Sequence, residues 1–411
     1  MKSDLDALML AQNIDALIVF GAGDHNPAMV YLTGGGHLTN AELVIRRGHK
    51  GVLFHGAMER EEAARTGMET RSFSQYPIAD YLAEAGGDRE KADVLRHKKM
   101  YTDAGLSSGR VAIYGMTELG FYYSLLTKLE KEMPGLEIIG YLEEDILLHA
   151  MASKSPDEIA RIREMGKITT RVVGRTADYM TGHKVKNGML VKANGDPLTI
   201  GEVKGMINLW LAEAGAENPE GTIFAIGRDA GVPHSTGTAS DPLRLGQTIV
   251  YDIFPCEAQG GYFYDFTRTW CLGYAPDDVL KLYDDVHSVY TQIISELKVG
   301  TPFSDYQSRV CDLYEAQGHP TIKTNPATEN GYVHSLGHGI GLRVHERPTA
   351  GMKSPVLDLL KPGSVITIEP GLYYPEKGMG VRLEDSLVVR NDGQFEILAP
   401  YPLDLVLPVK G

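Results

Sequence analysis

The chain has 411 residues, of which 43% are hydrophobic, and carries a formal net charge of -14 with a pI near 5.4. A chain of this length exceeds the size at which one hydrophobic core usually keeps growing, so two domains are expected. Because phosphate binding requires clustered Lys and Arg, the acidic composition argues against a nucleic acid or an anionic membrane as a partner.

The N-terminal stretch and the cysteines bear on where the protein works. Asp4, Asp6 and Asp15 interrupt the apolar residues of the first twenty positions, which therefore lack the apolar stretch of a secretory signal. No apolar run of 18 residues follows. Three cysteines form an odd set, which argues against a disulfide framework. These features predict a soluble, cytoplasmic protein.

Residues 1–150 are predicted to form an α/β domain. Short apolar runs typical of strands alternate there with helical stretches such as FYYSLLTKLEKEM. The runs are DALIVF, AELVIRR, KGVLFHG and RVAIYG.

A strong helix start marks the boundary to a second domain, residues 155–411. Ser155 suits the N-cap, Pro156 the first helical position and Glu158 the third, which together predict a capping box. Beyond it, the order of a long helix, a shorter helix and then strands occurs twice. This order indicates a duplicated α+β unit with a cleft between its halves.

Two later stretches each predict a hairpin that carries acidic residues. They are TIVYDIFPCEAQGGYFYDFTRTWCLG and ITIEPGLYYPEKGMGVRLEDSLVV. Side-chain alternation lets Asp252 and Asp265 point the same way on the first hairpin, and Glu369 and Glu384 on the second. Buried carboxylates without partners are costly and raise each other's pKa, so a cation must compensate them.

The stretch HSLGHGIGLRVHERP, residues 334–348, adds histidines set among glycines. Four carboxylates and one histidine make an oxygen-rich set whose charge balances two divalent ions, which carboxylates can bridge at about 3.5–4 Å. The set suits Mn²⁺, Co²⁺, Fe²⁺ or Zn²⁺, and ligand preference alone does not decide among them. A single Asp on a strand is more often solvated or salt-bridged, so it is the combination that favours a metal site.

This combination resembles the motif set of the metallopeptidase family that includes prolidase (Xaa-Pro dipeptidase), aminopeptidase P and methionine aminopeptidase. HSLGHGIGLRVHERP, DFTRT after an upstream Asp, TIEPG and VRLED carry the resemblance, which covers residues 155–411. The first domain is more loosely similar to the N-terminal domain of the prolidase and creatinase branch. The resemblance implies an α+β fold, with a pita-bread catalytic domain preceded by a smaller α/β domain.

The resemblance also implies a dinuclear metal site. Its ligands would be Asp252, Asp265, His338, Glu369 and Glu384, with Asp265 and Glu384 bridging the ions. The cofactor would be two divalent metal ions, first Mn²⁺, with Co²⁺, Zn²⁺ or Fe²⁺ as alternatives. The ions would share a hydroxide that attacks the first peptide carbonyl, and the flanking glycines would let the backbone approach ions and substrate closely.

Further residues would handle the substrate. Glu369 would carry the proton to the leaving nitrogen. His345 and His234 would bind the substrate and donate to its carbonyl oxygen, while His334 would support the site from nearby. His234 lies in GVPHSTG, where HSTGTASD replaces a longer proline-containing motif of the prolidase branch. Arg382 would contact the substrate or hold an acid in place through a salt bridge.

The two-domain layout points by resemblance to the prolidase-like branch, in which the bond before proline is cut in short peptides. Dipeptidase and aminopeptidase activity both stay open, although the HERP ending is more similar to dipeptidases. Relatives of this kind are often dimers, so a homodimer is expected. Three rival hypotheses are a creatinase-type amidinohydrolase without metal, a metal-dependent lyase or hydrolase of a small osmolyte, and a metal-free binding protein.

Overall fold

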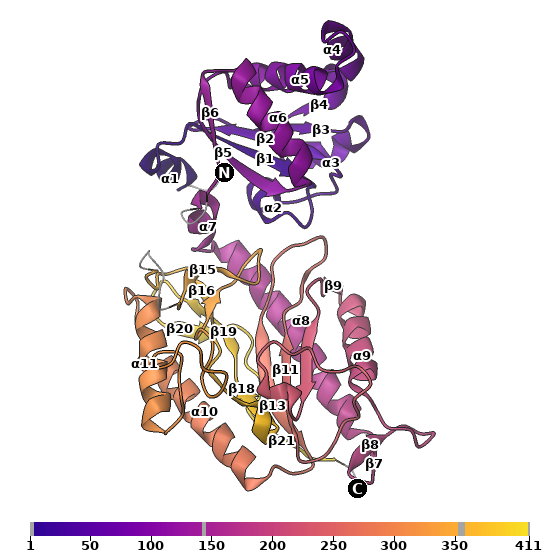
Figure 1. The fold of residues 1–411 in the computed structure, drawn as a ribbon, viewed down its shortest axis with the longest axis vertical. Helices are drawn as coiled ribbons and strands as arrows, with labels where there is room; N and C mark the ends of the chain where they lie inside the picture. Colours follow the sequence, from indigo (N-terminus) through magenta and orange to yellow (C-terminus); the bar gives the residue numbers. More distant parts are fainter. Residues whose placement is uncertain (1–3, 142–144, 352–357, 410–411) are drawn as a thin grey trace. The chain divides into compact units, whose positions relative to one another are not determined.

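The computed structural model describes residues 4–141, 145–351 and 358–409. The chain divides into two compact units, the first made of Met1–Met151 with Gln259–Gly261 and the second of Ala152–Ala258 with Tyr262–Gly411 (Figure 1). Among the helices of the described residues, none is long and apolar enough to span a membrane.

The first unit contains a six-stranded mixed sheet in the order β4-β3-β2-β1-β5-β6. The centre of this sheet is formed by the apolar runs that were predicted to be strands. β1 pairs in parallel with β5 and in antiparallel with β2. The strands are β1 (Ala16–Gly21), β2 (Ala41–Arg46), β3 (Val52–His55), β4 (Glu69–Ser72), β5 (Gly109–Met116) and β6 (Leu136–Ile139).

Helices complete this α/β unit. The buried residues of α5 (Arg89–Asp103) and α6 (Leu119–Glu132) share one apolar core with the sheet, in which Tyr101 and Leu129 contribute large side chains. The other helices are α1 (Leu5–Ala11), α2 (Pro27–Thr33), α3 (Arg60–Arg65), α4 (Ile78–Glu84) and α7 (Ile146–Met151), with short 3₁₀ turns η1 (Ala57–Glu59) and η2 (Phe73–Gln75).

The second unit is built around two antiparallel-rich sheets. The four-stranded sheet has the order β10-β11-β13-β21 and the five-stranded sheet the order β15-β14-β16-β19-β20. The first comprises β10 (Thr222–Ile226), β11 (Thr248–Ile253), β13 (Phe266–Leu272) and β21 (Val406–Leu407). The second comprises β14 (His338–Gly339), β15 (Glu346–Thr349), β16 (Val365–Ile368), β19 (Asp385–Val389) and β20 (Phe395–Ile397).

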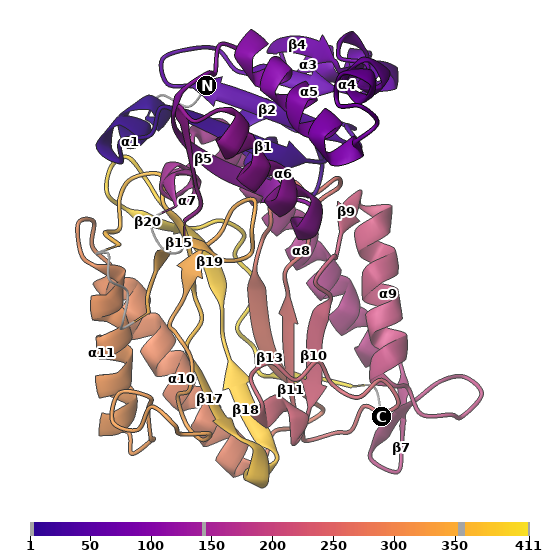
Figure 2. The same cartoon turned by 45° about the horizontal axis from the view of Figure 1, so that its top comes forward.

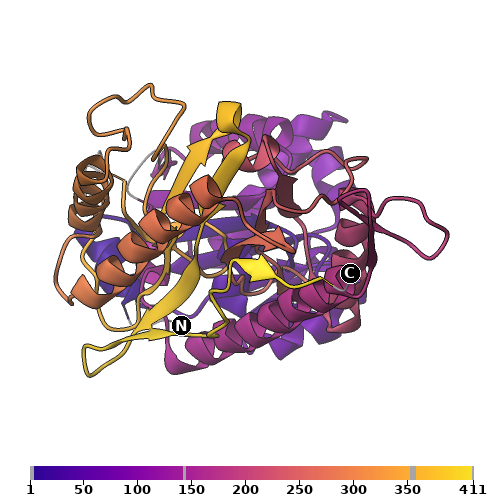
Figure 3. The same cartoon turned by 90° about the horizontal axis from the view of Figure 1, so that it is seen from below.

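Two pairs of helices flank these sheets, as the repeated order of elements predicted. Figures 2 and 3 show α8 (Pro156–Thr181) and α9 (Ile200–Glu213) beside the first sheet, and α10 (Asp277–Glu296) and α11 (Phe303–Ala316) beside the second. The predicted capping box at Ser155 and Glu158 is present at the start of α8. Ile162, Met165 and Thr169 repeat at helical spacing on the buried face of that helix.

Short elements complete the second unit. They are β7 (Lys184–Lys186) with β8 (Met189–Val191), β9 (Ala216–Glu217) with β12 (Cys256–Glu257), β17 (Gly371–Tyr374) with β18 (Met379–Arg382), and the 3₁₀ turns η3 (Asp229–Gly231) and η4 (Pro375–Lys377). A single bridge between Thr267 and Glu384 connects β13 to the segment between β18 and β19. The two halves therefore meet at one of the predicted ligands.

Candidate active site

All five predicted ligands line one cavity of about 460 Å³ in the second unit. Asp252 lies within β11 and His338 begins β14. The other three stand just outside strands: Asp265 precedes β13, Glu369 follows β16, and Glu384 precedes β19. Both sheets thus contribute ligands to the same cavity.

The second predicted hairpin is interrupted where it carries its glutamates. β16 pairs with β19 through Thr367 and Ser386, whereas β17 pairs with β18 through Gly371 and Arg382. Pro370 lies between the two paired regions and has no N–H to donate to a ladder. Glu369 lies in the break between β16 and β17, and Glu384 in the break between β18 and β19. The prediction of one continuous hairpin is therefore wrong.

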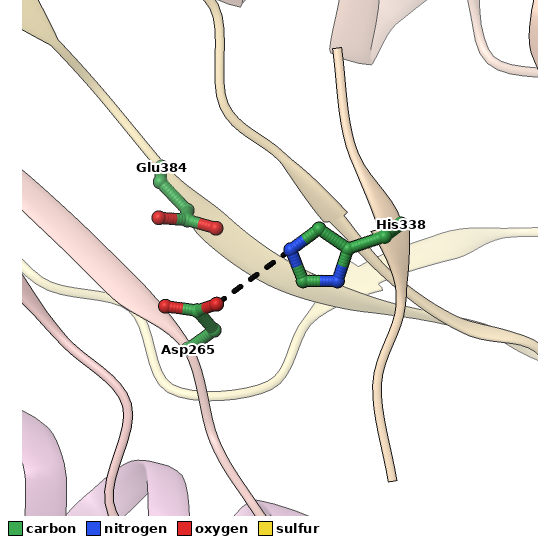
Figure 4. A group of neighbouring side chains, drawn as sticks. All are labelled: Asp265, His338 and Glu384. Atoms are coloured by element: carbon green, nitrogen blue, oxygen red, sulfur yellow. Dashed lines mark ion pairs between the residues drawn. The ribbon is translucent and has the colours of Figure 1, made fainter. Parts of the chain in front are cut away.

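Three of the predicted ligands form a tight group. Asp265, His338 and Glu384 each offer an atom that lies within 4.8 Å of the others, and their side chains face one another in Figure 4. Nε2 of His338 is 3.6 Å from Oδ2 of Asp265 and 3.5 Å from Oε1 of Glu369. Glu369 therefore adjoins the same histidine nitrogen.

The orientation of His338 is set by its backbone surroundings. Its Nδ1 lies 3.0 Å from the carbonyl oxygen of Gly339, which leaves Nε2 to face the carboxylates. A Cβ on Gly337 would stand 2.0 Å from the carbonyl oxygen of Thr367, and one on Gly339 would stand 2.1 Å from that of Arg347. These two glycines therefore allow neighbouring backbone to pack closely against the segment that carries His338.

Asp252 and Arg382 form a buried ion pair at the cavity wall. Nη2 of Arg382 donates to Oδ2 of Asp252 at 2.5 Å, and Nη1 donates to the Tyr373 hydroxyl at 2.8 Å. Arg382 also donates to the carbonyl oxygen of Pro233 and to the Thr267 hydroxyl. These contacts match the salt-bridge alternative for Arg382, with Asp252 as the acid.

Burial and mutual repulsion perturb the acids of the site. Burial, followed by the charges of Glu384, Asp252 and Glu369, raises the pKa of Asp265 well above its usual value. Burial and the charges of Glu369 and Asp252 raise the pKa of Glu384 in the same way. Burial raises the pKa of Glu369 to about 8, although Arg382 opposes the shift. The positive charge of Arg382 is therefore too small to compensate the negative charges of these carboxylates.

The donor set fits divalent cations. Among the described residues, no hydrogen-bond donor reaches Oδ1 of Asp252 or Oε1 of Glu384, although both oxygens are buried. Buried polar atoms without partners are rare in folded proteins and call for an explanation. Cations at the carboxylates would satisfy these oxygens and offset the repulsion, and the oxygen-rich set with one nitrogen suits metals of this charge.

The three further histidines also line the cavity. Nε2 of His334 lies 2.8 Å from the Tyr373 hydroxyl, and its Nδ1 lies 2.7 Å from the carbonyl oxygen of Ser335. The ring centroids of His345 and His338 lie 4.3 Å apart. Burial lowers the pKa of His334 and of His338 to about 3 and also lowers that of His345. The imidazoles of His334, His338 and His345 are therefore neutral at neutral pH.

Some residues that organise the site were missed in the sequence. Tyr373 connects His334 to Arg382, and the Thr267 hydroxyl donates to Oε2 of Glu384 at 2.6 Å. Thr367 Oγ1 accepts the backbone N–H of His338. The two threonines share strand faces with the predicted acids, so alternation could have indicated them, whereas Tyr373 lies beyond the break at Pro370.

The second unit has two α+β halves whose sheets meet at a cavity lined by acids and histidines, a donor set that suits divalent cations. The profile of metallopeptidase family M24 matches residues 160–391, which is more than half of the chain. The chain belongs to this family and is a peptidase.

Comparisons with known proteins agree with this assignment. An Xaa-Pro dipeptidase of Pyrococcus horikoshii is 26% identical over 400 residues, covering 95% of this chain and 92% of the relative. A prolidase structure from Pyrococcus horikoshii superposes with a TM-score of 0.71 at 21% identity, covering 98% of each chain. An X-Pro aminopeptidase structure from Thermotoga maritima gives a TM-score of 0.71 at 24% identity, covering 96% of this chain and 97% of its own. The predicted α+β pita-bread fold is confirmed.

Proposed function

We propose that this peptidase hydrolyses the bond preceding proline at the N-terminus of short peptides, as an Xaa-Pro dipeptidase or aminopeptidase. The observation that carries the proposal is the convergence of Asp252, Asp265, His338, Glu369 and Glu384 on one cavity. The names of the relatives, an Xaa-Pro dipeptidase and an X-Pro aminopeptidase among them, support the choice of bond. Such bonds call for a specialist because proline lacks an N–H and fixes the backbone angle φ.

Two divalent ions, Mn²⁺ first among the candidates, would be held by these five residues and would lower the pKa of a water molecule and polarise the peptide carbonyl. Arg382 holds Asp252 through one oxygen, and the other has no donor among the described residues. Thr267 fixes one oxygen of Glu384 in the same manner. These contacts orient the acids before any ion binds.

Glu369 is the group proposed to move the proton. Its side chain is 16% exposed, which leaves it accessible from the cavity. A carboxylate there can take a proton from the attacking water and give it to the leaving nitrogen. His345 and His234, both exposed at the cavity, are proposed to donate to the carbonyl oxygen, and the lowered pKa of His345 keeps that ring neutral.

The test measures release of the first amino acid from an Xaa-Pro dipeptide and an Xaa-Pro-Xaa tripeptide by Mn²⁺-loaded protein. Asp265→Asn is expected to abolish release, because it removes a buried ligand oxygen. Asp392→Asn, which changes an exposed acid in the turn between β19 and β20, serves as the matched control and should keep wild-type activity.

Cleavage of the dipeptide alone would assign a dipeptidase, and cleavage of the tripeptide would assign an aminopeptidase. No release from either peptide, with two ions bound per chain, would contradict the proposal. The metal-dependent lyase or hydrolase of a small osmolyte would then become the leading hypothesis.

A further inference from the structure

A buried ion pair lies behind the turn that carries His345. Nζ of Lys154 is 2.8 Å from Oε2 of Glu346, and the two side chains are 2% and 1% exposed. Lys154 directly precedes the N-cap of α8, and its backbone N–H donates to the carbonyl oxygen of Gly363. Neither residue lines the cavity, so the pair has no direct contact with a substrate.

The carboxylate of Glu346 forms the centre of the turn, residues 341–345. Its Oε1 accepts the backbone N–H groups of Leu342 at 2.7 Å and of Arg343 at 3.1 Å. A Cβ on Gly341 would lie 2.4 Å from Oε2, so only glycine allows the backbone to fold this closely over the carboxylate. The path of the turn therefore follows the position of one side chain.

The turn is also attached to the segment that carries Asp265 and to Asp358. The carbonyl oxygen of Gly341 accepts the N–H of Phe263, two residues before Asp265. On the other side, Arg347 and the N–H of Thr349 both bond the carboxylate of Asp358. His345 immediately precedes Glu346, and the centroid of its ring lies 4.3 Å from the centroid of the His338 ring. A shift of Glu346 would move His345 relative to the metal ligands.

We propose that Lys154 and Glu346 are a positioning pair that sets the imidazole of His345 in the cavity. The proposal rests on the function proposed above, in which His345 donates to the substrate. Lys154 compensates the charge of Glu346, and Glu346 shapes the turn through the two N–H groups that it accepts. A buried charge without its partner is strongly destabilising, whereas replacing both charges can be neutral.

The test compares Lys154→Met, Glu346→Gln and the double variant in the full-length, Mn²⁺-loaded protein. Each single variant leaves one charge buried alone and is expected to lower kcat about tenfold or more, because small misplacements of catalytic groups are costly. The double variant leaves no buried charge, and the Gln carbonyl can still accept both N–H groups. We expect its kcat to return to within about threefold of wild type.

A matched control separates positioning from stability. Val310→Ala removes a buried methyl pair from α11 in the core of the same unit and should lower the melting midpoint while leaving kcat unchanged. Single variants that lose stability but keep kcat, the behaviour expected of Val310→Ala, would overturn the proposal. A double variant no better than the worse single variant would overturn it as well.

A second readout does not depend on activity. The histidine ¹³Cε1 NMR signals are recorded for the metal-free protein. The signal of His345 is the one that disappears in His345→Asn. We expect the His345 signal to shift in both single variants and to return in the double variant, while the His234 signal stays constant. An unchanged His345 signal in every variant would refute the positioning role. No hydrolysis by the wild type, with the expected NMR pattern, would instead count against the proposed function alone.

Discussion

Asp252 divides its two carboxylate oxygens between two environments. Oδ2 receives the guanidinium of Arg382, and Oδ1 has no donor among the described residues. The sequence could indicate that both residues lie near the cavity, because each stands among acids on a strand. It could not indicate their pairing, since that depends on β11 and β18 lying side by side through contacts distant in the chain.

Glu220 adds a fifth carboxylate to the cavity lining, beyond the four that two divalent ions would balance. Burial lowers the pKa of His345, and the charge of Glu220 opposes this shift more than that of Asp252 does. Glu220 is exposed, so its charge remains available to a substrate.

We expect Glu220→Gln to reduce the preference for a first residue of Lys over Glu by about two- to fivefold in kcat/KM, the range of an exposed charge pair. The measurement compares Lys-Pro and Glu-Pro peptides at low and high salt, since screening should shrink the wild-type preference. Glu329→Gln, an exposed acid that does not line this cavity, is the control. Equal preferences in wild type and Glu220→Gln would refute this role.

At the scale of elements, α8 and the segment just before β13, which carries Asp265, approach each other closely at Gly166. A Cβ there would lie 2.6 Å from the ring of Tyr264 and 2.9 Å from the Cβ of Ala399. Gly205 in α9 has no atom within 4 Å of an added Cβ and provides a matched comparison in a helix of the same unit.

Gly166→Ala is expected to destabilise the protein by about 1–3 kcal/mol, because overpacking displaces Tyr264 and with it the neighbouring Asp265. It should also weaken Mn²⁺ binding. Gly205→Ala should instead stabilise by up to about 1 kcal/mol, the helix propensity difference between the two residues. Urea unfolding and calorimetric titration with Mn²⁺ measure both effects. Unchanged metal affinity in Gly166→Ala would contradict the coupling of helix and site.

Local patterns predicted the elements well where neighbouring residues determine them. The capping box of α8 and the strands of the first unit follow from spacing and apolar periodicity, and both are present. The prediction of one continuous second hairpin was wrong, because Pro370 interrupts the strand pairing. The placement of the five proposed ligands around one cavity required the two sheets to meet, which no local pattern encodes.

At the scale of the whole molecule, the site makes stability depend on pH and metal. Without ions, Asp265, Glu369 and Glu384 hold their protons to higher pH in the folded state than in the unfolded state. Below about pH 6.5 the buried neutral imidazoles of His334, His338 and His345 oppose this effect, because they bind fewer protons in the folded state than in the unfolded state. Between about pH 6.5 and the pKa of Glu369 near 8, the unfolded imidazoles are neutral as well, and the acids of the site bind more protons in the folded state. Stability must fall as pH rises through this window.

We expect the melting midpoint of the chelator-treated protein to decrease from about pH 6.5 to pH 8. Mn²⁺ should raise it increasingly over the same range, because the ligands must be deprotonated to bind. Thermal unfolding followed by circular dichroism measures both curves, and Glu369→Gln should flatten the metal-free one. A metal-free midpoint that rises across this window would contradict protonated acids in the folded site.

The bridge between Thr267 and Glu384 has a kinetic consequence. The two residues are 117 positions apart, yet their contact orients a proposed ligand. Closing so long a loop has an entropic cost that is offset only when many other contacts have formed. Contacts of such long range therefore slow folding. Tight metal binding should therefore appear only after the two halves have docked, so that the rate of ion uptake during refolding reports the last step of assembly.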